Sequence, residues 1–320
     1  MAEKTIAELE NQMLEIEHRI RDLEESSSKD SLDRNVEIKS LREKMEELQK
    51  SLFLQLTPYD IVKIARHPLR PLASDYINLM FDDFVELHGD KHFGDDKAII
   101  SGLGKIEEEK FLVIGQQKGK STKERIACNF GMPNPEGYRK ALQKMKLAEK
   151  FNLPIVTLID TPGANPDIGA EERGQARAIA ENIYEMSLLK TPIVNIVIGE
   201  GGSGGALGIG IGDKLAVLEY AYYSVISPEG CAAILWKNSE NAPEASRALQ
   251  LTASELLRLN VIDEIIPEPL GSAHKEPKAM AGVLRAYILK YIKGAKSIPI
   301  DNLLEKRYSK YRNIGEYREF

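Results

Sequence analysis

The sequence predicts an α/β fold preceded by a hairpin of two helices, and three observations point to this class. Short apolar runs rich in β-branched residues recur through the middle of the chain, each bounded by glycine or proline, as buried strands are. A segment of helical composition, 171–189, joins two of these runs, as expected of a crossover between parallel strands. Residues 1–56 instead carry apolar side chains at helical spacing, separated by charges.

The amino-terminal segment, 1–56, is predicted to form two amphipathic helices. The first spans about 4–23 and places its apolar residues at steps of three and four: Ile6, Leu9, Met13, Ile16, Ile20 and Leu23. After a serine-rich interruption at 26–31, the second runs from about Leu32 to Leu54, with Leu41, Met45, Leu48 and Leu52 on one face. We interpret this hairpin as a scaffold that packs on the main domain or on a partner subunit.

The remainder of the chain divides into three predicted parts. Prolines at 58, 68 and 71 indicate an irregular connector over 57–75, and the main α/β domain is expected over 76–296. Its predicted strands are 111–115, 155–160, 193–198, 215–218 and 223–226, and its later helices are 252–260 and 277–293. The last segment, 297–320, is polar and is expected to form a peripheral tail.

Composition narrows the classes of function. The 320 residues are 42% hydrophobic, enough to build a substantial core, and the formal net charge is −6. This balance gives no general attraction to nucleic acid or to anionic membranes. No apolar stretch is long enough to span a bilayer and no signal peptide is recognisable, so we expect a cytoplasmic protein. The two cysteines, Cys128 and Cys231, lack metal-ligand spacing and are expected to be reduced thiols.

A glycine-rich segment is the most informative feature of the chain. Eight of the 24 glycines lie within 199–212, directly after the predicted strand 193–198. Such a concentration indicates that the backbone itself approaches a ligand. The segment leads into a helix predicted to begin near Ala206, so the N–H groups of Gly204 and Gly205 could form an oxyanion hole.

The loop after the preceding strand has the same character. Asp160-Thr-Pro-Gly-Ala164 follows the predicted strand 155–160. The carboxyl ends of neighbouring strands form the usual ligand crevice of an α/β sheet. We therefore expect this loop and the glycine-rich segment to line one pocket.

Two further patterns match the glycine-rich segment. G-x-G-x-x-G at 199–204, with Glu219 about twenty residues on, is typical of dinucleotide binding, but the helix available before Asp213 is too short for that fold. The P-loop pattern fails, because no Lys-Ser or Lys-Thr pair follows the last glycine.

The other pattern that matches, the nucleophile elbow G-x-S-x-G, keeps a serine hydrolase open as an alternative. G-x-S-x-G at 201–205 makes Ser203 a candidate nucleophile, and Asp263 and His274 follow in the order that α/β-hydrolases use. Against this interpretation, Asp263 and His274 are close in sequence and the stretch between them contains two prolines and a glycine.

A cluster of basic residues follows the predicted strand 111–115. Its members are Lys118, Lys120, Lys123 and Arg125. Two interpretations stay open: a contact with a phosphate or a partner, or an ordinary solvated basic loop. His88 and His92 are the only histidines close together, and this spacing indicates a metal site only weakly, so no metal is predicted on this chain.

Seven separate blocks, in order, resemble the carboxyltransferase alpha subunits of bacterial-type acetyl-CoA carboxylase. They include Asp160-Thr-Pro-Gly-Ala164 and Gly199-Glu-Gly-Gly-Ser-Gly-Gly-Ala206. The others are 66–71, 94–98, 129–141, 169–175 and 224–236. The resemblance covers nearly the whole chain, and the helical hairpin and 265–270 agree with it.

The resemblance implies a crotonase-like fold of repeated β-β-α units after the helical hairpin. It implies transfer of a carboxyl group from carboxybiotin, presented by a biotin carboxyl carrier protein, to acetyl-CoA. The product would be malonyl-CoA, in the first committed step of fatty acid synthesis. Implied partners are a beta subunit, in an α2β2 heterotetramer, and biotin carboxylase. The beta subunit is expected to carry a zinc ribbon and most of the acetyl-CoA site.

The resemblance also assigns roles to residues. The backbone of Gly204 and Gly205 is expected to stabilise charge on the biotin ureido oxygen, and Gly163 and Ala164 to form the opposite wall. The hole for the acetyl-CoA enolate would belong to the beta subunit, with a biotin nitrogen as the base. Asn165-Pro-Asp167 departs from the family pattern, where an aromatic residue is expected first.

Further residues of the glycine-rich segment, Gly201, Gly202 and Ser203, are expected to line the substrate site, with Ser203 forming a turn. Two alternatives remain: a hydrolase or thioesterase that uses Ser203, Asp263 and His274, and a non-catalytic scaffold subunit whose glycines only permit tight packing.

Overall fold

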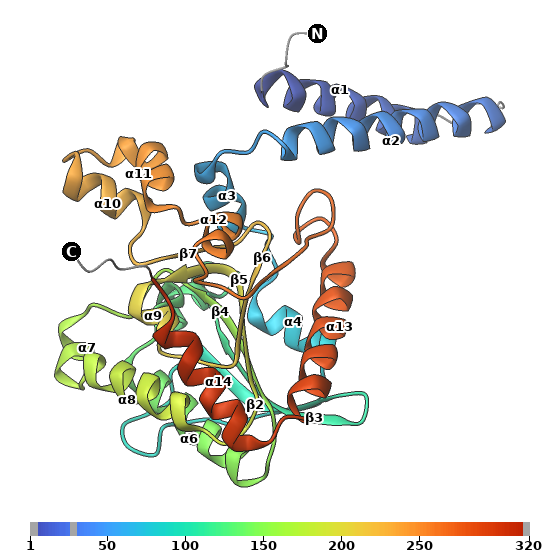
Figure 1. Ribbon diagram of the computed structural model, residues 1–320. Helices are drawn as coiled ribbons and strands as arrows, with labels where there is room; N and C mark the ends of the chain where they lie inside the picture. Colours follow the sequence, from blue (N-terminus) through green and yellow to red (C-terminus); the bar gives the residue numbers. More distant parts are fainter. Residues whose placement is uncertain (1–5, 26–30, 316–320) are drawn as a thin grey trace.

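The amino-terminal hairpin is present as predicted. The computed structural model describes residues 6–25 and 31–315. Helix α1 (Ile6–Glu25) lies against α2 (Ser31–Phe53), with Ile16, Leu48 and Leu52 buried between them. The serine-rich interruption predicted at 26–31 lies outside the described residues except for Ser31. Figure 1 shows the hairpin extending away from the sheet, joined to it through α3 (Pro58–Ala65).

The expectation of an irregular connector over 57–75 is wrong. Helix α3 fills 58–65, and α4 (Ala73–Met80) begins before the segment ends. Pro58 stands in the first turn of α3, where proline costs no hydrogen bond, and Thr57 and Asp60 form a capping box. Only the short stretch 66–72 is irregular, while the domain boundaries themselves stay a prediction.

A mixed sheet forms the centre of the molecule, in the order β1-β2-β3-β4-β5-β6-β8. The first three strands pair antiparallel, and β3 to β6 and β8 run parallel. The strands are β1 (Asp82–Glu86), β2 (Ile99–Ile106), β3 (Glu109–Gln116), β4 (Ile155–Thr161), β5 (Ile193–Gly202), β6 (Lys214–Leu218), β7 (Tyr222–Ser224) and β8 (Glu264–Ile266). Each predicted strand is confirmed near its expected position, whereas β1, β2 and β8 were not predicted.

On the edge away from β4, strand β5 pairs with two other strands in turn. Along 194–197 it pairs with β6, and along 200–202 it pairs with β7. Residues 199–202 of the glycine-rich segment are therefore the end of a strand rather than a loop. Helix α9 (Ser203–Leu207) follows at once, so it begins three residues earlier than expected.

Helices cover both faces of the sheet. Figure 1 shows α4 and α13 on one side and α6 and α8 on the other. The remaining bounds are α5 (Thr122–Ala127), η1 (Asn129–Gly131), α6 (Pro135–Lys150), α7 (Ile168–Glu172), α8 (Gln175–Leu188), α10 (Pro228–Leu235), η2 (Ser239–Asn241), α11 (Ala242–Leu249), α12 (Ala253–Arg258), α13 (Pro277–Ala295) and α14 (Ile300–Arg312). The crossover predicted over 171–189 is interrupted at Gly174, whose φ of +82° separates α7 from α8.

The expectation of a peripheral tail over 297–320 is wrong for its described part. Helix α14 packs on α8, and its Arg307 is only 1% exposed. The Arg307 guanidinium forms two hydrogen bonds with the carboxylate of Asp213, at 2.7 and 2.8 Å. It also donates to the carbonyls of Met186, Leu189 and Thr191. One buried cation therefore ties α14 to the segments that lead into β5 and β6.

Replacing Arg307 with methionine is expected to lower the free energy of unfolding by about 3–5 kcal/mol. The change leaves the buried Asp213 carboxylate without its cation and removes the donor from three carbonyls. Urea unfolding of the full chain measures the loss. Lys306→Met, at the exposed neighbouring position, is the matched control and should change stability by less than about 0.5 kcal/mol. Equal losses in the two variants would contradict the prediction.

Candidate functional site

The two loops expected to share a pocket do lie against each other. Thr161, at the end of β4, pairs with Gly201 of β5. A Cβ added to Gly205 would lie 2.5 Å from the backbone nitrogen of Ala164, and one added to Gly202 would lie 2.8 Å from that of Gly163. The main chains therefore touch, and no side chain fits between them. This contact explains why glycine occupies these two positions.

Other glycines of the same two loops face open space. A Cβ at Gly163 would meet no heavy atom within 4 Å, and one at Gly204 would only touch the side chain of Ile179, at 3.9 and 4.0 Å. Ser203, with a φ of +50°, turns the chain from β5 into α9. Gly204 and Gly205 then fall in the first turn of α9, where N–H groups have no acceptor within the helix. Gly204 is thus half-buried with open space beside it, whereas Gly205 is buried against the backbone of Gly163.

The residues of the possible serine hydrolase are engaged elsewhere. Asp263 accepts a hydrogen bond from the Leu215 N–H at 2.7 Å and pairs with Lys310 at 2.7 Å. The His274 ring stacks on His67 with a centroid separation of 3.9 Å, and burial lowers its pKa to about 4. Within the described residues, no hydrogen bond joins Ser203 to either of them. The geometry does not support that alternative.

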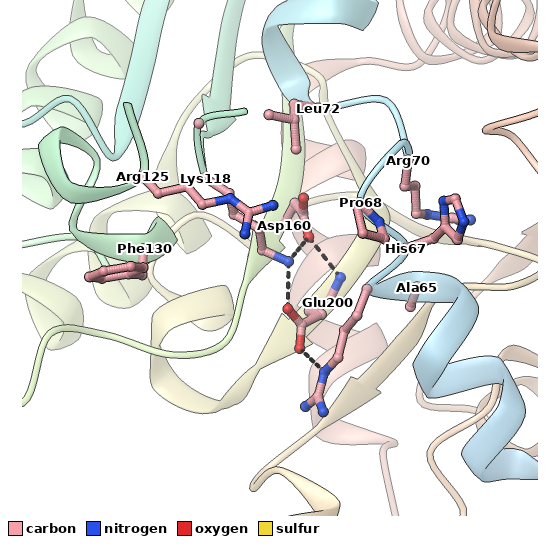
Figure 2. Close-up of a pocket in the computed structure, with 12 residues that line it drawn as sticks. Ala65, His67, Pro68, Arg70, Leu72, Lys118, Arg125, Phe130, Asp160 and Glu200 are labelled. Carbon is pink, nitrogen blue, oxygen red and sulfur yellow. Dashed lines mark hydrogen bonds and ion pairs between the residues drawn. The ribbon is translucent and has the colours of Figure 1, made fainter. Parts of the chain in front are cut away.

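Charged side chains meet just beside the glycine-rich segment, and we call Arg66, Lys118, Asp160 and Glu200 the strand-end cluster. Lys118 Nζ lies 2.6 Å from Asp160 Oδ1 and 2.5 Å from Glu200 Oε2 (Figure 2). Arg66 Nε lies 2.6 Å from Glu200 Oε1, and Asp160 accepts the Glu200 N–H at 2.9 Å. The cluster therefore joins the ends of β3, β4 and β5.

Electrostatics keep Lys118 and Glu200 charged. Burial raises the pKa of Glu200, but Lys118 and Arg66 outweigh burial and hold it at about 2. Burial lowers the pKa of Lys118, and the two carboxylates reverse this effect, so its pKa lies above the ordinary value. For Asp160, burial prevails and raises the pKa. The ammonium of Lys118 thus offsets the cost of burying two carboxyl groups next to each other.

The basic residues predicted as one group separate in the structure. Lys118 points into the strand-end cluster, whereas the mostly exposed Lys120 pairs with Asp75. Arg125 and Phe130 line a cavity of about 260 Å³ beside the cluster, also shown in Figure 2. Lys118 is therefore not part of a solvated loop, and a phosphate or partner contact at Lys118 or Lys120 stays a prediction. The sequence feature that indicates the strand-end cluster is Glu200, a lone carboxylate at the end of a buried strand.

Asn165, where the resemblance led us to expect an aromatic residue, holds the loop together. Its side chain donates to Asn134 Oδ1 at 2.7 Å and accepts from the Asp167 N–H at 3.1 Å. The residue is only 6% exposed. It supports the loop that contains Gly163 and Ala164 rather than offering a surface for stacking.

Residues 6–25 and 31–315 present neither a metal cluster nor a membrane-spanning helix. No group of three or more His, Cys, Asp or Glu residues in these ranges is placed to hold a metal ion. No helix of the same ranges has both the length and the apolar character needed to cross a membrane. Cys128 and Cys231 are free and buried, as expected.

The fold matches that of several solved structures. Solved structures similar to this chain include transcarboxylase 12S, with a TM-score of 0.55 and 20% identity over 72% of this chain and 44% of that one. A Pseudomonas malonate decarboxylase hetero-tetramer in complex with coenzyme A gives a TM-score of 0.56 at 13% identity, over 68% and 86% of the two chains. The protein thus has the crotonase-like fold of carboxyltransferases, which confirms the expected fold class.

Sequence comparison then gives the family. The model described as "Acetyl co-enzyme A carboxylase carboxyltransferase-like" matches residues 6–315. The acetyl-coenzyme A carboxylase carboxyl transferase subunit alpha of Rhodopirellula baltica is 54% identical over 314 residues, 96% of this chain and 98% of that protein. The subunit alpha of Geobacter metallireducens is 48% identical over 319 residues, the full length of both. The chain belongs to the acetyl-CoA carboxylase carboxyltransferase alpha-subunit family.

Proposed function

We propose that this chain forms the biotin-facing half of an acetyl-CoA carboxyltransferase site. The reaction moves a carboxyl group from carboxybiotin on a carrier protein to acetyl-CoA and gives malonyl-CoA for fatty acid biosynthesis. The observation that carries the proposal is the open space at the start of α9: a Cβ added to Gly204 would meet only Ile179, at 3.9 and 4.0 Å, and one added to Gly163 on the facing loop would meet nothing within 4 Å. A cytoplasmic location remains part of the proposal.

The open backbone fits the ureido group of biotin. This group presents an oxygen acceptor, and the N–H groups at the start of α9 are donors. Side chains on Gly163 or Gly204 would fill the space that the group needs. Bound there, carboxybiotin supplies the activated carboxyl group.

In this proposal the chain contributes fixed dipoles. Gly204 and Gly205 donate to the ureido oxygen, where negative charge develops, and Gly163 and Ala164 form the facing wall. Gly201, Gly202 and Ser203 place α9 by shaping the end of β5 and the turn after it. Donors that are already oriented stabilise such charge without reorganisation, and one donor is worth about 10²–10³ in rate.

The same proposal requires partners. Described residues around Gly204 and Gly163 provide backbone donors for one oxygen, whereas carboxyl transfer develops charge on two. We assign the second oxyanion hole, the zinc ribbon and most of the acetyl-CoA site to a beta subunit, in an α2β2 assembly. Exposed apolar side chains support a protein partner. On α8 and α10 these are Tyr184, Leu188, Ile234 and Leu235. Biotin carboxylase and the carrier protein would complete the system.

Malonyl-CoA decarboxylation coupled to biotin carboxylation tests the proposed function. The assay compares this chain alone, the candidate beta subunit alone and the mixture. We expect activity only in the mixture, because each chain holds half of the site. Activity of this chain alone, or none in a mixture shown to form a complex, would contradict the proposal.

Ser203→Ala separates a turn residue from a nucleophile. We expect less than about a tenfold loss of transfer in the mixture, because the hydroxyl has no role beyond the turn. If Ser203 were a nucleophile, the substitution would instead lower the rate about 10⁴–10⁶-fold. The kcat of the purified mixture decides between them, with Ser224→Ala on β7 as the matched control.

A further inference from the structure

The carbonyl of Gly205 is held by two buried side chains from other elements. Gln116 Nε2, at the end of β3, donates to it at 2.7 Å, and the Tyr138 hydroxyl, on α6, donates to it at 3.1 Å. Both side chains are fully buried. The Ile209 N–H, which a regular helix would direct to this carbonyl, bonds to Ala206 instead. The hydrogen bonds that hold the Gly205 carbonyl therefore come from outside α9.

Helix α9 needs such support. It has five residues, and Gly204 and Gly205 are two of them. Glycine disfavours the helical state by about 1 kcal/mol relative to alanine, and isolated helices of this length do not form in water. The direction of its first N–H groups must therefore be imposed by tertiary contacts.

The other end of the Gln116 amide binds the second loop. Its Oε1 accepts the Asp160 N–H at 3.1 Å, and Asp160 begins the segment that leads to Gly163 and Ala164. One carboxamide thus spans the two backbones of the proposed site. Because an amide has both a donor and an acceptor end, it can make both bonds at once, which a carboxylate cannot.

Tyr138 is equally restrained. Its ring packs against Gly208, where an added Cβ would lie 2.6 Å from the ring Cδ1. Burial raises the pKa of the Tyr138 hydroxyl well above its ordinary value, so it remains protonated and can donate. The hydroxyl is therefore fixed in position and in protonation state.

We propose that Gln116 and Tyr138 are positioning residues for carboxyl transfer. By holding the Gly205 carbonyl they fix the peptide that follows Gly205, and with it the first turn of α9, which carries the N–H groups of Gly204 and Gly205. This inference rests on the proposed function. Neither residue touches the reacting atoms; both act through Gly205. A donor moved by about 1 Å can cost about 10²-fold in rate, so we expect the loss of either contact to lower kcat.

Gln116→Glu gives the most specific test. Glutamate keeps the acceptor for the Asp160 N–H and loses the donor to Gly205. At about pH 8 we expect kcat of the mixture with the beta subunit to fall about 10- to 100-fold, with KM for malonyl-CoA unchanged. Burial raises the pKa of such a carboxyl, and its protonated form can donate again. The ratio of variant to wild-type kcat should therefore rise as the pH falls towards about 6.

Tyr138→Phe is the milder second variant. It keeps the ring against Gly208 and removes only the hydroxyl. We expect kcat to fall about 3- to 10-fold with no pH-dependent recovery. Asn195→Asp is the matched control for the buried amide, because Asn195 donates to Thr157 and to the Ile209 carbonyl but not to Gly205. It should lower stability and leave kcat and its pH profile unchanged.

Spectra of ¹⁵N-glycine-labelled free chain give a readout that does not depend on activity. In Gln116→Glu and Tyr138→Phe, the amide signals of Gly204 and Gly205 should shift and exchange faster with solvent, whereas Asn195→Asp should leave them in place. Unmoved glycine signals, or unchanged kcat in an active mixture, would overturn the positioning role. An inactive wild-type mixture with shifted signals would instead overturn the proposed function alone.

Discussion

Gly204→Val is expected to reduce carboxyl transfer by about 10²–10³-fold while the chain remains folded. The valine Cβ has room, because it would meet only Ile179 at ordinary contact distance. In the proposed site its methyl groups would occupy the open space that the acceptor oxygen needs. The kcat of the mixture with the beta subunit and the melting temperature of the free chain measure the two effects.

A control at another open glycine completes this test. Gly282 lies on the exposed side of α13, and an added Cβ there would meet nothing within 4 Å. Gly282→Val should therefore leave transfer intact. The same change at Gly205 is less informative, because its Cβ would collide with the backbone of Ala164 and disturb the fold as well. Normal transfer in Gly204→Val would remove the donor role.

Lys118→Met is expected to lower the free energy of unfolding by about 3–5 kcal/mol. The substitution keeps most of the length of the side chain but leaves the buried carboxyls of Asp160 and Glu200 next to each other without the ammonium between them. Lys120→Met, two residues further on, removes an exposed lysine whose pair with Asp75 is worth less than about 1 kcal/mol. Urea unfolding of both variants gives the comparison.

The loss in Lys118→Met should depend on pH. In the wild-type chain Glu200 has a folded pKa of about 2, below its ordinary 4.5, so its contribution is present in full above about pH 4.5 and is lost progressively as the pH falls towards about 2. Without the ammonium, burial raises the folded pKa of Asp160 further, and the folded variant binds protons more readily than the unfolded chain. The difference in stability should therefore shrink from about pH 8 to about pH 5. A constant difference would contradict this account.

Periodic and compositional features were predictable from the sequence. The hairpin and the central strands follow from apolar spacing, and the contact between the two loops follows from their place at neighbouring strand ends. The resemblance to a carboxyltransferase family, based on seven ordered blocks, gave the crotonase-like fold, which spacing alone does not specify. The comparisons confirm the family and the fold.

Features that depend on distant partners were not predictable. Lys118 looked like one member of a basic loop because its partner Glu200 lies 82 residues away. Arg307 was hidden for the same reason: α14 is polar, and its few buried residues, such as Leu303, give little apolar pattern. Pro58 misled in a different way, because a proline in the first turn begins a helix rather than breaking it.

The close backbone contacts at Gly202 and Gly205 have a consequence for inhibition. A compound that hydrogen-bonds to main-chain N–H groups at this junction contacts atoms that every amino acid except proline carries, so other substitutions cannot delete them. Neither glycine can gain even a methyl group without collision with the facing loop. Escape from such a compound is therefore expected to arise in surrounding side chains, at the expense of fitness, rather than at the contact itself.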